Sequence, residues 1–196
     1  MSEKRYFFDS VCHQWDQMCE HDAGKIRSLL GYLDMSPGDK ILDVGTGTGV
    51  LIPFIREINA RGKILGIDNS SGMISVAREK FKADKFTNFC IADIERDVIE
   101  GIFDHIILYS VFPHLQRKSE TMRRLVRKNL KEGGRLLIAH SQSRNELNKM
   151  HKNIDERVAS DVLIEVNEQC RIFRAFGLSV YEAVENDDFY MIMLEK

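Results

Sequence analysis

The sequence predicts an α/β fold built on a doubly wound sheet of seven strands with helices on both faces. Five short apolar strand patterns alternate with helical patterns between residues 41 and 140, and two closely spaced strand patterns follow near the C-terminus. Strands separated by crossover helices pair in parallel, whereas strands joined by a tight turn pair as an antiparallel hairpin. We therefore expect a Rossmann-like, mostly parallel sheet with a C-terminal antiparallel hairpin and an N-terminal helical cap.

The first 35 residues have helical periodicity, because apolar side chains such as Val11, Trp15 and Met18 recur three or four positions apart. The turn-forming sequence Met-Ser-Pro-Gly-Asp at 35–39 closes this cap. The strands of the parallel part are expected at 41–44, 63–68, 86–91, 103–109 and 135–140. The helices between them are expected at 50–58, 71–81 and 119–130, with Ser70 or Ser71 as the N-cap of the second helix.

The last third of the chain begins with a polar, irregular segment at 141–164. Its expected elements are a short helix at 144–151, a helix at 165–176 and the hairpin strands at 179–185 and 189–195. Upstream of this region, Gly133 and Gly134 are expected to end the helix that precedes the fifth strand. The chain has no repeat or low-complexity linker, so one domain over residues 1–196 is expected.

The composition limits the classes of partner. Hydrophobic residues make up 43% of the 196-residue chain and charged residues 30%, which is typical of globular proteins. A net charge of −2 favours neither nucleic acid nor an anionic membrane, and the basic cluster at 123–128 is interpreted as a solvated helix face. The sequence shows no apolar run of about 18 residues, no signal-peptide pattern and no C-x-x-C pair among its four cysteines. These features predict a cytoplasmic protein with free thiols.

Polar or aromatic side chains follow every strand of the parallel part. In doubly wound sheets, ligands bind at the carboxyl ends of the strands, near the point where the strand order reverses. The groups expected at this edge are Asp43 to Gly49, Asp68 to Ser70, Asp93 and Ile94, then Tyr109, Ser110, Phe112 and His114, and finally His140 and Ser141.

The segment Lys40–Val50, read as K-I-L-D-V-G-T-G-T-G-V, is the strongest binding motif. A strand followed by a glycine-rich turn and a helix allows backbone N–H groups to approach a ligand closely. A dinucleotide fingerprint needs glycine where this chain has Val50, and a phosphate-binding loop needs G-K-[ST], which is absent. Asp68 suits a ribose diol and Asp93 an exocyclic amine. Together these residues indicate an adenosine-containing ligand without a pyrophosphate.

Five motifs in this order resemble those of the class I S-adenosylmethionine-dependent methyltransferases of the small-molecule type. The motifs are I-L-D-V-G-T-G-T-G (41–49), G-I-D-N-S-S-G-M-I (66–74), I-A-D-I-E (91–95), F-D-H-I-I-L-Y-S-V-F-P-H-L (103–115) and L-K-E-G-G-R-L-L-I (130–138). The leader F-F-D-S-V-C-H-Q-W-D-Q-M is similar to the segment that caps the cofactor in such enzymes, including those that C-methylate quinones. The resemblance divides the chain into a helical cap (1–35), a cofactor-binding half (36–140) and an acceptor-side segment with the hairpin (141–196).

The resemblance implies a role for each matching residue. Gly45 and Gly47 would approach the methionine moiety, Asp43 would orient it, and Tyr109 would offer its carbonyl to the same end. Asp68 would hold the ribose hydroxyls. The cofactor-binding residues expected in this way are Trp15, Asp43, Gly45, Gly47, Gly49, Asp68, Asn69, Met73, Asp93, Ile94 and Tyr109. The implied cofactor is S-adenosyl-L-methionine, and the product is S-adenosyl-L-homocysteine.

Two histidines are the candidates for catalysis. In methyl transfer from a sulfonium the protein mainly aligns donor and acceptor, and it supplies a base only if the acceptor must lose a proton. His114 and His140 follow adjacent strands and are our candidates for that base or for orienting the acceptor, although each is also acceptable as a structural histidine. His151 is a further candidate for lining the acceptor pocket. The Cys12, His13, Cys19 and His21 group matches no compact zinc pattern, so no metal site is expected.

Other classes of function stay open at this point. A non-catalytic protein that binds S-adenosylmethionine or S-adenosylhomocysteine would carry the same loop, and a nicotinamide oxidoreductase is disfavoured only by Val50. The expected partners are a small-molecule methyl acceptor and either no other subunit or one further copy of the chain. Neither nucleic acid nor membrane is an expected partner.

Overall fold

The computed structural model describes residues 3–19, 21–154, 159 and 161–196. The strands are β1 (Ile41–Val44), β2 (Ile64–Asp68), β3 (Thr87–Ile91), β4 (Phe103–Tyr109), β5 (Leu130–His140), β6 (Ser179–Glu185) and β7 (Tyr190–Glu195). The helices are α1 (Glu3–Val11), α2 (Trp15–Met18), α3 (Ala23–Gly31), α4 (Ile52–Ile58), α5 (Ser71–Lys80), the 3₁₀ helix η1 (Phe112–His114), α6 (Lys118–Lys128), α7 (Arg144–Ile154) and α8 (Val166–Ala175). Parts of the predicted cap (1, 2 and 20) and of the acceptor-side segment (155–158 and 160) lie outside the described residues.

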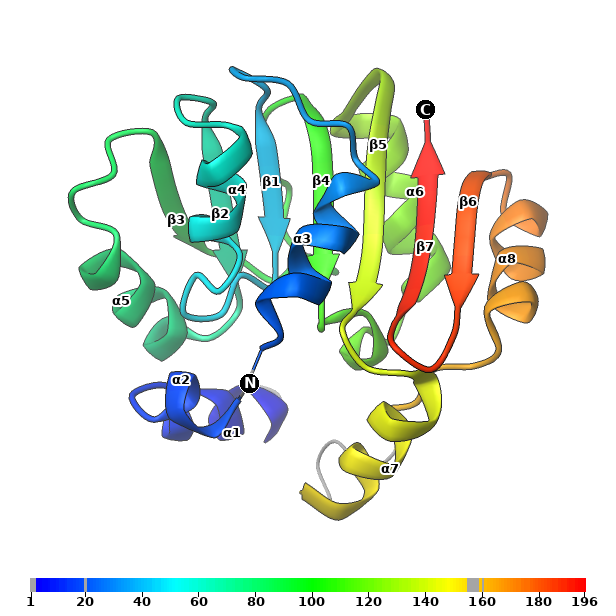
Figure 1. The fold of residues 1–196 in the computed structure, drawn as a ribbon, viewed down its shortest axis with the longest axis horizontal. Helices are drawn as coiled ribbons and strands as arrows, with labels where there is room; N and C mark the ends of the chain where they lie inside the picture. Colours follow the sequence, from blue (N-terminus) through cyan, green and yellow to red (C-terminus); the bar gives the residue numbers. More distant parts are fainter. Residues whose placement is uncertain (1–2, 20, 155–158, 160) are drawn as a thin grey trace.

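The strands form a seven-stranded sheet with the order β3-β2-β1-β4-β5-β7-β6 (Figure 1). The first five strands pair in parallel, while β7 is antiparallel to both β5 and β6. The strand order reverses between β1 and β4, which places the switch point beside the glycine-rich loop. The predicted Rossmann-like fold class is therefore confirmed.

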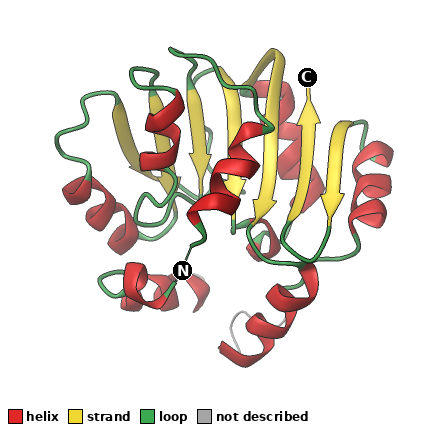
Figure 2. Cartoon of the chain, in the orientation of Figure 1, coloured by secondary structure: helices red, strands yellow, loops and turns green. Residues whose placement is uncertain are grey.

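Each face of the sheet buries a separate apolar core. Strand β4 shows why, because alternate side chains of a strand point to opposite faces. Ile106 and Leu108 pack in the core beneath α6 and α8, whereas Ile107 packs in the core beneath α3 and α4. The layers are visible in Figure 2, where helices lie in front of and behind the sheet. Burial on both faces explains why β1 and β4 consist mostly of apolar residues.

The largest difference from the predicted elements is in β5. The glycine pair Gly133–Gly134 was expected to end a helix, but α6 already ends at Lys128 and β5 begins at Leu130. Leu130 pairs with Phe103 of β4, and the register then shifts before His105. Gly133 has a φ of +73°, a conformation that favours glycine, so the pair makes an irregularity inside the strand.

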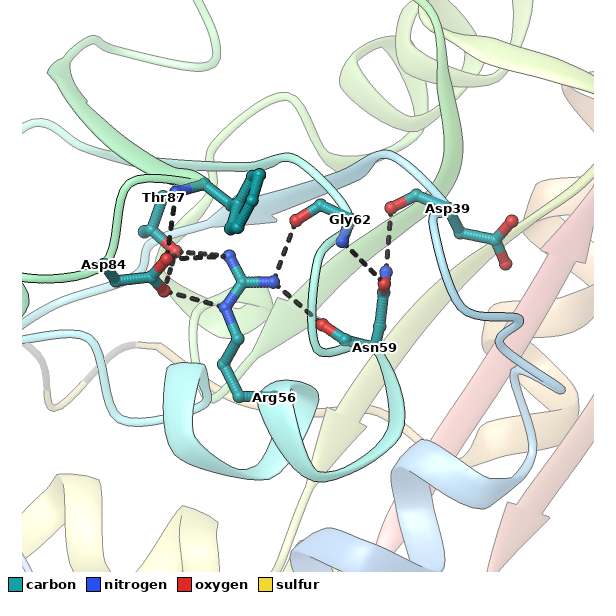
Figure 3. A network of polar contacts seen from close by, with 7 residues as sticks. Asp39, Arg56, Asn59, Gly62, Asp84 and Thr87 are labelled. Carbon is teal, nitrogen blue, oxygen red and sulfur yellow. Dashed lines mark hydrogen bonds and ion pairs between the residues drawn. The ribbon is translucent and has the colours of Figure 1, made fainter.

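The amino-terminal edge of the sheet is held by a network around Arg56 of α4 (Figure 3). Its Nε lies 2.7 Å from Asp84 Oδ2, and its Nη1 donates to the carbonyls of Asn59 and Gly62 at 2.8 Å each. A further bond of 2.8 Å joins Nη2 to Thr87 Oγ1. The network ties the end of α4 to the starts of β2 and β3, at the edge opposite the glycine-rich loop.

Replacing Arg56 by alanine should lower the free energy of unfolding by about 2–3 kcal/mol. Breaking a fully buried ion pair costs about 3–5 kcal/mol, and the two side chains here are 17% and 19% exposed, so solvent screening reduces that figure. Urea unfolding would measure the loss. Arg27→Ala is the matched control because its pair with Glu57 is 53% and 46% exposed, and its effect should be much smaller. Equal losses in the two variants would contradict this account of the network.

None of the helices in the described part of the chain is both long and apolar enough to cross a membrane.

Candidate active site

A cavity of about 430 Å³ lies at the carboxyl ends of β1, β2 and β4. The end of β3 contributes through the segment 92–96, and the cap contributes through Phe8 and Trp15. In Figure 1 the helices α1, α2 and α7 lie at this edge, where the arrow of β1 ends. The lining brings together the predicted residues Trp15, Asp43, Gly45, Gly47, Asp68, Asn69, Met73, Asp93, Ile94, Tyr109 and His114. Gly49 and His140, also predicted, are not part of this lining.

The glycine-rich loop folds back onto the end of β2. The backbone N–H groups of Gly45 and Thr46 both donate to the Ile67 carbonyl, at 2.8 and 2.9 Å. Gly45 has a φ of +69°, and a Cβ at this position would lie 2.5 Å from Cγ2 of Val111. The loop therefore needs glycine at position 45 both for its backbone conformation and for its close packing against the segment after β4.

Gly49 packs away from the cavity. Its φ is +86°, and a Cβ there would lie 2.4 Å from Cε2 of Phe81. The absence of a side chain lets the loop approach the Phe81 ring at the end of α5. The structure thus gives the third glycine a packing role, unlike Gly45 and Gly47, which line the cavity.

Two carboxylates lie at the base of the cavity. Asp43 is buried, and its Oδ2 accepts a hydrogen bond of 2.6 Å from Thr46 Oγ1. Burial, together with the nearby charge of Asp68, raises the pKa of Asp43 to about 7. Asp68 accepts from the Gly47 N–H at 3.0 Å and from the Ser70 N–H at 2.9 Å. Burial raises the pKa of Asp68 as well, although these hydrogen bonds oppose the shift.

Asp68 therefore joins the two loops that surround it. Through its two oxygens it connects the glycine-rich loop to the N-terminus of α5. Of the two predicted N-cap candidates, Ser70 is the N-cap, and its Oγ accepts from the Met73 N–H at 3.1 Å. Asn69 and Met73 line the cavity beside it.

Asp93 begins a turn and also lines the cavity. Its Oδ1 accepts from the Glu95 N–H at 2.9 Å, and its Oδ2 lies 3.4 Å from Arg96 Nε. Ile94 is buried, and its carbonyl accepts a hydrogen bond from Arg124. Both predicted residues are thus held in place by the turn after β3.

Two aspartates bind the helical cap to the glycine-rich loop and to α5 with its N-cap. Asp9 Oδ1 accepts from Ser70 Oγ at 2.6 Å and from the Gly72 N–H at 2.9 Å. Asp16 accepts from Thr48 Oγ1 at 2.5 Å and pairs with Lys80 Nζ at 2.7 Å. These bonds hold α1 and α2 over the cavity. The sequence did not identify either aspartate, because their partners are 32 or more positions away in the chain.

An aromatic wall runs along the cap side of the cavity. The ring centroid of Phe8 lies 5.6 Å from that of Trp15 and 5.7 Å from that of His114, edge to face in both cases. Trp15, one of the predicted cofactor-binding residues, also lines the cavity. Phe8 was not identified from the sequence.

On the side of the cavity lined by Tyr109, three polar side chains lie within hydrogen-bond distance of one another in a row. The Tyr109 hydroxyl is 2.7 Å from Ser141 Oγ and 3.2 Å from His21 Nδ1. His21 lines the cavity, and its buried Nε2 has no hydrogen-bond partner among the described residues. Burial lowers the pKa of His21, although the charge of Asp16 opposes the shift. Sequence reasoning considered His21 only as a metal ligand and therefore missed this position.

The three predicted histidines lie near one another but in different surroundings. His114 lines the cavity, and its Nδ1 is 2.7 Å from Oδ2 of the buried Asp161. His151 packs against His114 with ring centroids 5.1 Å apart and ring planes tilted by 37°. His140 is fully buried, and burial, with His114 and His151 nearby, lowers its pKa to about 3. His140 is therefore neutral and enclosed, and the structure does not bring it to the cavity with His114.

Within the described residues, no group of three or more His, Cys, Asp or Glu side chains is arranged to hold a metal ion.

Comparison with known proteins gives the family. A family model described as a methyltransferase domain matches residues 35–193. A malonyl-(acyl-carrier protein) O-methyltransferase of Priestia megaterium is 35% identical over 99 residues, which cover 50% of this chain and 35% of that protein. The chain thus matches only about a third of the length of that curated relative.

Solved structures show the same fold. A chain from the complex between the Haloferax volcanii Trm112 methyltransferase activator and a methyltransferase has a TM-score of 0.80 at 19% identity, covering 96% of both chains. Phosphoethanolamine N-methyltransferase 2 of Haemonchus contortus, in complex with S-adenosyl-L-methionine, has a TM-score of 0.72 at 17% identity, over 89% of this chain and 52% of that one. The family model covers most of the chain and the fold agrees, so this protein belongs to the methyltransferase domain family and has the class I S-adenosylmethionine-dependent methyltransferase fold.

Proposed function

We propose that this protein transfers the methyl group of S-adenosyl-L-methionine to a small-molecule acceptor by in-line displacement. The observation that carries the proposal is the convergence of Gly45, Gly47, Asp43, Asp68 and Asp93 on one cavity at the switch point of the sheet. These residues come from three separate motifs, which a chance glycine turn would not bring together.

The charges of the cavity fit this cofactor. Among the described residues, the carboxyl groups of Asp43, Asp68, Asp93 and Glu95 line it, together with one guanidinium, that of Arg96. Asp43, with a pKa of about 7, carries part of a negative charge at neutral pH. An acidic cavity favours a ligand with a sulfonium and an ammonium group and disfavours a polyanion such as nucleic acid. S-adenosylmethionine would supply an electrophilic methyl group at this position.

The chain's own residues would hold and align the reactants. Asp68 would accept hydrogen bonds from the ribose hydroxyls, Asp93 would accept from the adenine amine, and Asp43 would face the cationic end. Trp15 and Phe8 would exclude water on the cap side. Such alignment is worth about 7–11 kcal/mol in favourable cases, so positioning alone accounts for much of the expected rate. His114 would orient the acceptor or take its proton.

Isothermal titration with S-adenosylmethionine, S-adenosylhomocysteine and NAD tests the cofactor assignment. The first two ligands should bind and NAD should not, because Val50 occupies the position of the third dinucleotide glycine. A methyl-labelled cofactor incubated with a metabolite extract would then reveal the acceptor by mass spectrometry. Binding of NAD without binding of S-adenosylmethionine would contradict the proposal.

Cofactor binding should release protons near neutral pH. With a pKa of about 7, Asp43 is partly protonated, and a cation beside it favours the carboxylate. At pH 7 we expect release of about half a proton, rising towards one at pH 6. Titration in phosphate and in Tris, which differ in ionisation enthalpy, measures this number. Asp43→Asn should remove the buffer dependence, and a wild-type enthalpy that is the same in both buffers would contradict the assignment.

A further inference from the structure

His114 forms a close pair with a carboxylate that enters the site from a distant part of the chain. Asp161 Oδ2 lies 2.7 Å from His114 Nδ1, and the two side chains are 4% and 16% exposed. His114 belongs to η1, directly after β4, whereas Asp161 follows α7, and the two residues are 47 positions apart. Among the described residues, no hydrogen bond involves the second ring nitrogen of His114, Nε2.

The chain fixes Asp161 through α7. The side-chain amide of Asn148 donates to the Leu163 carbonyl and accepts from the Leu163 N–H, both at 2.8 Å. His151, one turn further along α7, places Nδ1 2.5 Å from the Asp161 carbonyl. The backbone is therefore held at the Asp161 carbonyl and at Leu163, which limits how far the Asp161 carboxylate can move from His114. Asn148 and His151, spaced as N-x-x-H along α7, thus position Asp161.

We propose that Asp161 and His114 act as a general-base pair and that the methyl acceptor is a hydroxyl group on an apolar, phenol-like skeleton. The inference rests on the proposed function and extends it to the class of acceptor. A carboxylate that accepts a hydrogen bond from Nδ1–H selects the tautomer in which Nε2 carries the lone pair. His114 Nε2 is then able to take a proton from a ligand in the cavity that His114 lines.

The proposed methyl transfer is a displacement coupled to a proton transfer. The acceptor oxygen forms a bond to the methyl carbon while the carbon–sulfur bond breaks and its electron pair stays on sulfur. The hydroxyl proton moves to His114 Nε2, and Asp161 stabilises the resulting imidazolium without taking the proton itself. No oxidant, reductant or metal is required for this balance.

The His114–Asp161 pair also favours one class of methyl acceptor over others. A carboxylic acid is already ionised at neutral pH and needs no base, whereas a phenol has a pKa near 10 and gains from one. The surroundings of His114 favour an apolar skeleton, because the Phe8 ring packs edge to face at 5.7 Å and Val111 and Leu115 line the same cavity. A hydroxyl on a ring satisfies both conditions.

The tautomer of His114 gives a readout that is independent of the acceptor. In the protein with ¹⁵N-labelled histidine, His114 should be protonated at Nδ1 and unprotonated at Nε2 when neutral, as assigned by two-bond ¹⁵N–¹H correlations. The His114→Gln variant identifies the signals. A neutral His114 that carries its proton on Nε2 would overturn the proposal, because that nitrogen would then have no lone pair for the acceptor.

Kinetics with a matched panel test the pair and the acceptor class together. The panel consists of phenol, aniline and benzoic acid derivatives with the same ring substituents, assayed with methyl-labelled S-adenosylmethionine. We expect transfer to a phenol, with kcat about 100-fold or more lower in Asp161→Asn, KM and cofactor affinity changed less than about 3-fold, and partial recovery in Asp161→Glu. Asp39→Asn is the control, because it alters a similar pair, with His105 at 3.1 Å, at the opposite edge of the sheet.

The other results of these assays would contradict different parts of the proposal. Transfer to the benzoic acid or aniline members alone, or to none of the panel, would overturn the hydroxyl assignment. Equal rates in wild type and Asp161→Asn would overturn the general-base pair. Titration of the same samples with S-adenosylmethionine separates these results from a failure of the proposed function: bound cofactor without phenol methylation rejects only the acceptor class, whereas absence of cofactor binding rejects the function itself.

Discussion

Replacing Asp68 by alanine should weaken S-adenosylmethionine binding by about 100-fold or more. Hydrogen bonds to a charged group contribute about 1.5–3 kcal/mol each, and two ribose hydroxyls would lose their acceptor together. The variant also removes the acceptor for the Gly47 and Ser70 N–H groups, so both loops of the cavity lose their connection. Isothermal titration measures the affinity directly.

Two further variants test whether the loss of cofactor affinity is specific to the Asp68 carboxylate. Asp68→Asn keeps the shape and one acceptor oxygen, so it should fall between wild type and Asp68→Ala. Asp84→Ala removes a carboxylate that also accepts a backbone N–H, but at the amino-terminal edge of the sheet, and it should lower stability while leaving cofactor affinity unchanged (Figure 3). If Asp68→Ala bound S-adenosylmethionine as tightly as wild type does, the ribose assignment would be wrong.

Replacing His114 by alanine should lower kcat by about 100- to 10,000-fold once the acceptor is identified. This range is typical for the loss of a general base. Cofactor affinity should change little, because the cofactor-side carboxylates lie on other loops. The measurement is steady-state transfer of labelled methyl groups, with cofactor affinity determined on the same protein.

His140 provides the contrast to His114. It is fully enclosed and its pKa of about 3 keeps it neutral, so His140→Asn should change the free energy of unfolding more than it changes turnover. Turnover lost equally in His114→Ala and His140→Asn would contradict the distinct positions of the two histidines. Unchanged turnover in His114→Ala would remove His114 from the mechanism.

The sequence predicted the sheet, and most of the binding residues it indicated line one cavity, because the signals for both are local. Strand β4 ends in the apolar run Ile106 to Tyr109, and Asp68 is the last residue of β2, whose register with β1 places it beside the glycine-rich loop. Gly49 illustrates the limit of such motifs. The glycine pattern does not indicate that Gly49 packs against the ring of Phe81.

The proposed acceptor side depends on contacts between residues far apart in the sequence, which no local pattern contains. Asp161 meets His114 across 47 positions, and His21 meets Tyr109 across 88. Phe8 packs against His114 from α1, near the N-terminus of the chain. The strand-end histidines were visible in the sequence, but which of them faces the cavity depends on how β5 and α7 pack. This is also why the sequence could not distinguish His114 from His140.

A crystal structure of the protein with S-adenosylhomocysteine tests the central claim most directly. The account predicts the ribose hydroxyls within hydrogen-bond distance of Asp68, the adenine amine near Asp93, and the sulfur facing the side of the cavity lined by Tyr109 and His114. A ligand bound outside this cavity, or a sulfur that faces away from His114 with the ribose distant from Asp68, would contradict it.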